Sequence, residues 1–149
     1  MEEKDKKIHE KFGKSLFNRT WDLMDKKDRT IEEDFEMIHT THASSYHWSQ
    51  IGEPINFQRG EWQVSRVYAI LKHPNECLFH AQRCLELTEK HDIKDFDLAF
   101  ANEAMARAYS IAGKSEMKEE FVKKAKDAAE LIADKEDKDY FLSELATID

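Results

Sequence analysis

Residues that interrupt helices are scarce in this chain, and most of them stand at natural joints. The 149 residues include only 4 glycines and 2 prolines. Glycine and proline are the strongest local breakers of regular structure, so their scarcity leaves room for long helices joined by short turns. Gly52 and Pro54 close one apolar-periodic segment, Pro74 suits the first turn of another, and Gly113 follows a third. The pattern predicts an all-α fold.

Apolar residues at helical spacing divide the chain into seven expected helices. We place them at about residues 6–27, 30–51, 56–72, 74–91, 96–112, 115–132 and 135–147. Thr30 and Glu33 match the spacing of a capping box, and Asn56 is a favourable N-cap. Helices of similar length with short turns favour a stack of antiparallel hairpins, at about 6–52, 55–91 and 95–134, in a single domain 1–149. The helix at 135–147 is expected to cap the open end of the stack.

The acidic net charge of the chain limits the kinds of partner that it is expected to bind. The net charge is −8 and the sequence pI is about 5.4, which disfavours nucleic acid and anionic membranes because both need a basic footprint. No apolar run approaches the length of a membrane span, and the first residues have no apolar signal region, so we expect a cytoplasmic protein. Cys77 and Cys84 lie seven positions apart in one expected helix, ~10 Å apart, and should be reduced thiols.

A spacing of 41 residues recurs along the chain. It relates small residues to small ones and aromatic residues to aromatic ones, in the pairs Ser65 and Ala106, Cys84 and Ala125, Tyr68 and Tyr109 (109 − 68 = 41), and Trp21 and Trp62. Small residues recur where helices approach closely, and large residues recur where they fill the space between helices. The spacing therefore predicts repeated helical hairpins.

The segment 104–113 resembles the first helix of a tetratricopeptide repeat. That family shows a small residue, an aromatic residue three positions later and a glycine four further on, and Ala106, Tyr109 and Gly113 fit this pattern. Ala125 stands where the family has the small residue of its second helix. The resemblance covers about residues 56–134. The period of 41 exceeds the usual 34 of the family and implies longer helices.

The preceding units depart from the family pattern. In the unit that contains Ser65, Tyr68 and Cys84, a lysine, Lys72, stands at the glycine position. The unit formed by the first two expected helices matches poorly at both its small and its aromatic position.

The expected helix at 30–51 carries the most suggestive polar residues. His39 and His42 fall on the same helical face as Ile31 and Phe35, and Glu36 with His39 has the Glu-x-x-His spacing of di-iron helical bundles. One interpretation is a metal or small-ligand site that uses Glu36, His39 and His42. The other, which we favour, is that both histidines are hydrogen-bonded within the helix packing.

The resemblance also implies where a partner would bind, because the first helix of each tetratricopeptide hairpin lines a concave groove. The positions that match the groove are Arg59, Trp62, Arg66, Ala69, Phe100, Glu103, Arg107 and Ser110. Among them, the residues that we expect to contact a partner are Arg59, Trp62, Arg66, Glu103 and Arg107. A stripe of two arginines with a tryptophan between them would suit a carboxylate-bearing peptide. The open alternative is that Arg66 and Arg107 pair internally with Glu61, Glu103 or Asp97.

The sequence favours a protein- or peptide-binding module with no catalytic activity and no cofactor. The alternative is a metal- or small-ligand-binding helical protein, with an enzyme among the options, centred on His39 and His42. A third possibility is self-association into a homo-oligomer through an exposed helix face.

Overall fold

Seven α-helices and no strands make up the structure, a computed structural model that describes residues 1–149. The helices are α1 (Glu3–Asp25), α2 (Ile31–Ile51), α3 (Pro54–Ile70), α4 (Pro74–Lys90), α5 (Asp95–Ile111), α6 (Ser115–Ala129) and α7 (Lys135–Leu145). The prediction of an all-α fold is confirmed. Each observed helix lies within about three residues of its expected range.

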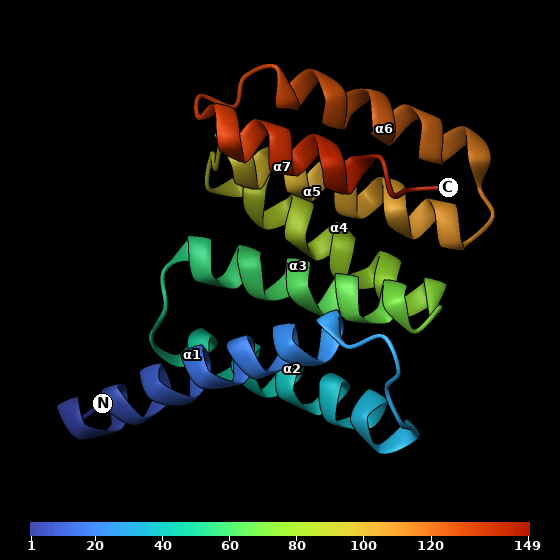
Figure 1. The fold of residues 1–149 in the computed structure, drawn as a ribbon. Coiled ribbons are helices and arrows are strands. Elements are labelled where there is room, and N and C mark those ends of the chain that lie inside the picture. Colours follow the sequence, from blue (N-terminus) through green and yellow to red (C-terminus); the bar gives the residue numbers. More distant parts are fainter.

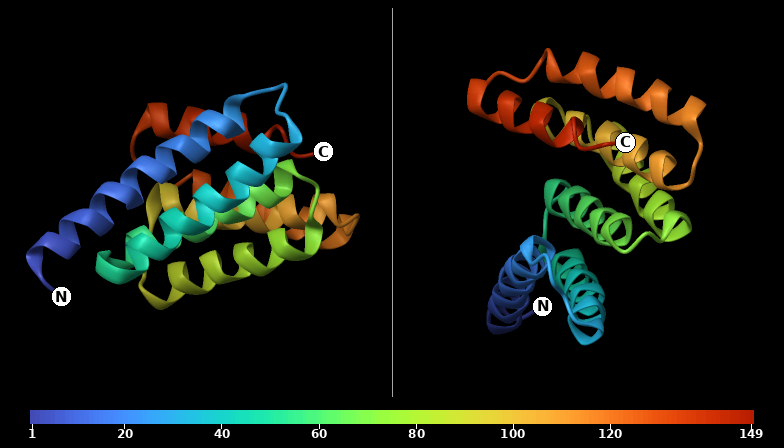
Figure 2. Two further views of the ribbon diagram at one scale, coloured as in Figure 1. Left: turned by 90° about the horizontal axis from the view of Figure 1, so that it is seen from below. Right: turned by 45° about the vertical axis from the view of Figure 1, so that its right-hand side comes forward.

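Neighbouring helices pair into three hairpins that follow one another along the molecule (Figure 1). Helix α1 packs on α2, α3 packs on α4, and α5 packs on α6, while α2 contacts α3 and α4 contacts α5. Helix α7 packs against both α5 and α6. The first hairpin has the two longest helices, and the N-terminal turns of α1 extend beyond the rest of the stack (Figure 2).

Local capping explains two of the helix starts. Thr30 caps α2 through the predicted capping box: its side chain accepts from the Glu33 backbone, and the Glu33 side chain accepts from the Thr30 N–H. Helix α3 begins earlier than expected, at Pro54. Asn56 is therefore not the N-cap but the third residue of the helix, and it closes a capping box in which its side chain accepts from the Glu53 N–H. Proline in the first turn needs no hydrogen-bond partner, which favours this earlier start.

The 41-residue spacing is visible in the backbone as well as in the side chains. Gly113 has a left-handed φ of 72°, and Lys72, which is 41 residues earlier, has a φ of 61°. Both residues follow the first helix of a hairpin, so the turn keeps the same conformation although only one position has a glycine. The small residues of the repeat, Ser65, Cys84, Ala106 and Ala125, are all buried, at most 1% exposed. Small side chains let the helices approach closely at these positions.

One expectation about α2 is wrong. Ile31 and Phe35 mark the apolar face that the helical spacing assigns to α2, yet they are 69% and 58% exposed. The buried face of α2 consists instead of Met37, Thr40, Thr41 and Ser44. Burial of these hydroxyls is possible because each has a partner: Thr20 donates to Thr40 at 2.8 Å, Thr41 donates to the Gln63 side chain at 2.9 Å, and Ser44 donates to the Gly13 carbonyl at 2.7 Å.

Gly13 of α1 lies against the Trp48 side chain of α2. A Cβ atom at this position would lie 2.9 Å from Nε1 of Trp48, so the tryptophan ring occupies the space that a side chain would need. Glycine is therefore required here for the approach of the two helices, whereas its helical φ places no demand on it.

Candidate functional site

Four helices that are not consecutive in the sequence meet around one aromatic cleft. Its volume is about 230 Å³. The residues that line it come from α1, α3, α5 and α7, and are Phe17, Trp21, Gln58, Arg59, Trp62, Phe96, Asp97, Phe100 and Tyr140. We call this set the aromatic cleft. It lies on the side of the stack formed by the first helix of each hairpin, which is the side where the resemblance implies a groove.

Trp62 stands at the centre of the aromatic contacts. Its ring stacks on Trp21 at a centroid distance of 5.7 Å and meets Phe100 edge to face at 5.5 Å. The Arg66 guanidinium lies over the Trp62 ring, 5.3 Å from its centroid. Such contacts fix the orientation of large rings beyond the effect of burial alone. The wall of the cleft is therefore built from rings that hold one another in place.

Arg59, one of the expected contact residues, closes one edge of the cleft by pairing with Asp97. Its Nε and one Nη donate to the two carboxylate oxygens, each at 3.0 Å. The hydrogen bonds with Asp97 raise the pKa of Arg59, against the opposing effect of burial. The bidentate pair engages both oxygens of Asp97 and neutralises its charge at this edge of the cleft.

The other three charged residues expected to bind a partner form a buried ion cluster with Glu144 of α7. Both Arg66 and Arg107 donate to the same oxygen of Glu103, Oε1, at 3.3 and 2.7 Å. Arg66 also donates to Oε2 of Glu144 from two nitrogens, at 3.0 and 3.1 Å. Glu103 is fully buried, and its second oxygen, Oε2, has no partner. The cluster joins α3, α5 and α7.

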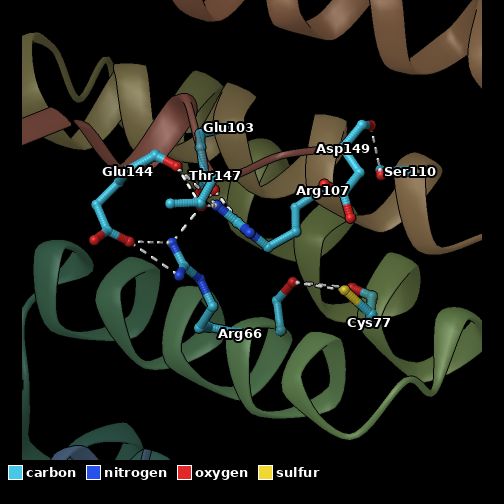
Figure 3. Close-up of polar contacts among 9 residues, drawn as sticks. Arg66, Cys77, Glu103, Arg107, Ser110, Glu144, Thr147 and Asp149 are labelled. Carbon is cyan, nitrogen blue, oxygen red and sulfur yellow. Dashed lines mark hydrogen bonds and ion pairs between the residues drawn. The ribbon is translucent and has the colours of Figure 1, made fainter. Parts of the chain in front are cut away.

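The C-terminal residues of the chain lie against this cluster. Figure 3 shows Arg66 and Arg107 reaching toward Glu144 and Thr147 from α3 and α5. Arg107 donates to the Glu144 carbonyl at 3.0 Å and to the Thr147 hydroxyl at 2.8 Å, and the Ser110 hydroxyl donates to the Asp149 carbonyl at 3.1 Å. The internal pairing considered for Arg66 and Arg107 is thus present, with Glu103 as the shared acceptor.

Gln58 forms part of the cleft wall and is only 1% exposed. Its amide nitrogen donates to the Thr88 hydroxyl and to the Asp97 carbonyl, both at 3.0 Å. The Thr88 hydroxyl donates to the Cys84 carbonyl at 2.7 Å, so it must accept from Gln58. Both contacts therefore require the nitrogen, which fixes the orientation of the amide. The amide oxygen, Oε1, has no hydrogen-bond partner.

The three residues suggested for a metal site do not converge. Glu36 pairs with Arg19 at 2.7 Å, His39 is exposed, and the His42 Nε2 is 2.8 Å from the Tyr68 hydroxyl. Partial burial lowers the pKa of His42, and the charge of the nearby His80 lowers it further. No group of three or more His, Cys, Asp or Glu side chains in the structure could hold a metal ion. His42 is thus hydrogen-bonded between helices, whereas His39 is not packed.

The cysteines belong to the core. Cys77 and Cys84 are free and fully buried. Burial raises the pKa of Cys77 to about 11, and burial likewise raises the pKa of Cys84. His80, which lies between them in the sequence, points its Nδ1 to Glu61 Oε2 at 2.6 Å. Neither thiol is therefore poised for nucleophilic chemistry.

Several cleft residues were not predicted from the sequence, although Phe100 was among the positions matched to the groove. The residues missed are Phe17, Trp21, Gln58, Phe96 and Tyr140, of which Trp21 carried a signal in its 41-residue spacing from Trp62. Gln58 carried none, because its role depends on contacts with Thr88 and Asp97 that lie 30 and 39 residues away.

The chain shows no match to a protein-family model, to a curated protein or to a solved structure. In addition, none of the seven helices combines the length and the apolar character that crossing a membrane requires.

Proposed function

We propose that this protein is a scaffold that binds a protein or peptide partner in the aromatic cleft. The observation that carries the proposal is the cleft itself, where three hairpins and α7 present six aromatic rings around one opening. Binding sites in proteins are typically concave, mostly apolar and equipped with a few polar groups, and aromatic residues dominate the energetics of interfaces. The resemblance of residues 56–134 to tetratricopeptide repeats supports the same side of the stack.

The proposed contact residues differ in part from those expected from the sequence. Arg59 and Trp62 line the cleft, whereas Arg66, Glu103 and Arg107 are occupied by one another and by α7. Their proposed role is indirect. Arg66 and Arg107 share Glu103 as an acceptor and bind Glu144, which fixes α7, and α7 places Tyr140 in the cleft wall. A partner would then meet aromatic surface in place of the free guanidinium groups that the sequence suggested.

Selection of binding peptides from a library of random linear peptides would test this proposal. The peptides recovered on the wild-type protein are then measured against Tyr140→Ala, which removes one wall of the cleft at a residue that is 46% exposed. The matched control is Phe79→Ala on α4, which removes an aromatic ring that is 69% exposed and lies outside the cleft. Weaker binding to Tyr140→Ala alone is the expected result. Equal binding to both variants and the wild type would contradict the proposal.

A cytoplasmic location is part of the same proposal. Its support is the presence of two free, buried cysteines, since unpaired thiols are typical of proteins in reducing compartments. Recovery of the native protein in an oxidising extracellular fraction would contradict this part alone.

A further inference from the structure

Two unpartnered polar atoms belong to residues of the aromatic cleft, and they are complementary in kind. One is an acceptor, Oε1 of Gln58, and the other is a donor, Nε1 of Trp62. Buried polar groups in proteins are almost always hydrogen-bonded, so each such atom asks for an explanation. The third buried atom without a partner, Oε2 of Glu103, belongs to the ion cluster and not to the cleft wall.

The two residues also lie close together on one helix. Gln58 and Trp62 are four residues apart on α3, so their backbones are separated by about one helical turn, or ~6 Å along the axis, and their side chains leave the same face. The orientation of the Gln58 amide is fixed by Thr88 and Asp97, so the unpartnered atom is an oxygen and cannot be exchanged for the nitrogen by a flip of the amide. Two residues of the cleft wall, in consecutive turns of the same helix, thus carry one unpaired acceptor and one unpaired donor.

A peptide backbone carries the complement of this pair. In an extended chain the N–H and the C=O of one residue point to the same edge, as they do in the hydrogen-bonded pairs of an antiparallel sheet. A charged group is less suitable, because the bidentate pair of Arg59 and Asp97 leaves no unpaired charge in the cleft wall. A purely apolar group would leave both polar atoms without partners.

We infer that the cleft binds one extended residue of a partner peptide through its backbone. The N–H of that residue donates to Gln58 Oε1, its C=O accepts from Trp62 Nε1, and its uncharged apolar side chain lies among the aromatic rings. Both protein atoms are sealed from solvent in the free protein, so the peptide must displace side chains above them. This inference rests on the proposed peptide-binding function.

The test on the protein side is a matched pair of conservative substitutions. Trp62→Phe removes the indole N–H and keeps an aromatic ring, and Trp21→Phe makes the same chemical change in the ring that stacks on it. Nε1 of Trp21 is not among the unpartnered buried atoms. Peptides selected from the random linear library should bind Trp62→Phe about tenfold more weakly than Trp21→Phe, the effect of one buried hydrogen bond.

The test on the peptide side needs no variant of the protein. In a series of single N-methylated forms of a selected peptide, methylation at one residue should weaken binding to the wild type by about tenfold, because it removes the N–H that Gln58 accepts. Methylation at residues outside the cleft should have a much smaller effect. Thermal melting of both tryptophan variants shows whether any loss of binding reflects unfolding.

The outcomes separate this inference from the proposed function. Peptides that depend on Tyr140 but bind both tryptophan variants equally, and tolerate methylation at every position, would overturn the backbone recognition and leave the peptide-binding function standing. If no selected peptide depends on Tyr140, both are overturned. Weaker peptide binding to Trp62→Phe, together with one peptide position where N-methylation weakens binding, would support both the backbone recognition and the proposed function.

Discussion

Trp21 and Trp62 stack on each other with ring centroids 5.7 Å apart and planes inclined by 27°. The two residues are 41 positions apart (62 − 21 = 41), so they occupy equivalent places in the first and second hairpins. The stacked pair joins α1 to α3 and forms one wall of the aromatic cleft. The repeat in the sequence is thus also a contact in space.

This pair should contribute to the coupling of the first two hairpins. We expect a double-mutant cycle with Trp21→Ala and Trp62→Ala to give a coupling free energy of about 1 kcal/mol, the range measured for aromatic pairs. The measurement is urea unfolding of the four proteins. A parallel cycle of Trp21→Ala with Phe79→Ala, whose ring is exposed on α4, serves as the control and should give a coupling near zero.

The buried ion cluster predicts a large loss of stability when one partner is removed. Arg107→Ala should lower the free energy of unfolding by about 3 kcal/mol, because Glu103 is fully buried and would be left with the longer contact to Arg66. The control is Arg83→Ala, which breaks the exposed pair with Glu86 and should cost less than about 1 kcal/mol. Similar losses for the two variants would show that the cluster has no special role in stability.

Lys72 and Gly113 share a left-handed backbone conformation, so introducing glycine at one and removing it from the other should change stability in opposite directions. Lys72→Gly should raise the free energy of unfolding by about 0.5–1 kcal/mol, because glycine adopts a positive φ without steric penalty. Gly113→Ala should lower it by about 1 kcal/mol through the backbone alone, since a Cβ there would meet no atom within 4 Å. Both are measured by chemical denaturation. A destabilised Lys72→Gly would contradict the strain that we assign to this turn.

The raised pKa of the Cys77 thiol predicts that the free energy of unfolding falls at high pH. Burial raises the pKa of its thiol from an ordinary value of 9.0 to about 11, so the unfolded chain loses the proton at lower pH than the folded protein. The stabilisation is therefore fully present below about pH 9 and is lost as the pH rises from 9 toward 11. Cys77→Ala should flatten the dependence of unfolding free energy on pH by about 2 kcal/mol across this interval. Parallel curves for the variant and the wild type would refute the assignment.

The fold could be predicted because it depends on local signals. The capping box at Thr30, the proline at position 74 and the turn at Gly113 act within a few residues, and the helix boundaries follow from them. The exposed face of α2 could not be predicted in the same way. An apolar stripe normally faces the core, but here the packing uses hydroxyl pairs, and the partners of Thr41 and Ser44 lie on other helices.

The candidate site shows the same division. Trp62 and Arg59 could be predicted as cleft residues, since the resemblance assigns their positions to the groove. The ion pairing of Arg66 and Arg107 could not be predicted, because it depends on Glu144, which lies 78 and 37 residues further along the chain. Charge pairing at such separations depends on where α7 packs against α5, and single-sequence patterns do not contain that information.

The position that holds Trp62 in the second hairpin holds Glu103 in the third (62 + 41 = 103). At the first junction it makes an apolar stack with Trp21, and at the second it accepts hydrogen bonds from Arg66 and Arg107. The two joints of the stack should therefore respond differently to solvent. Cooling weakens apolar contacts and therefore acts on the first joint, whereas the second joint depends on buried ion pairs. Because the stability of stacked repeats is a sum over neighbours, the end from which the molecule begins to unfold should depend on the conditions.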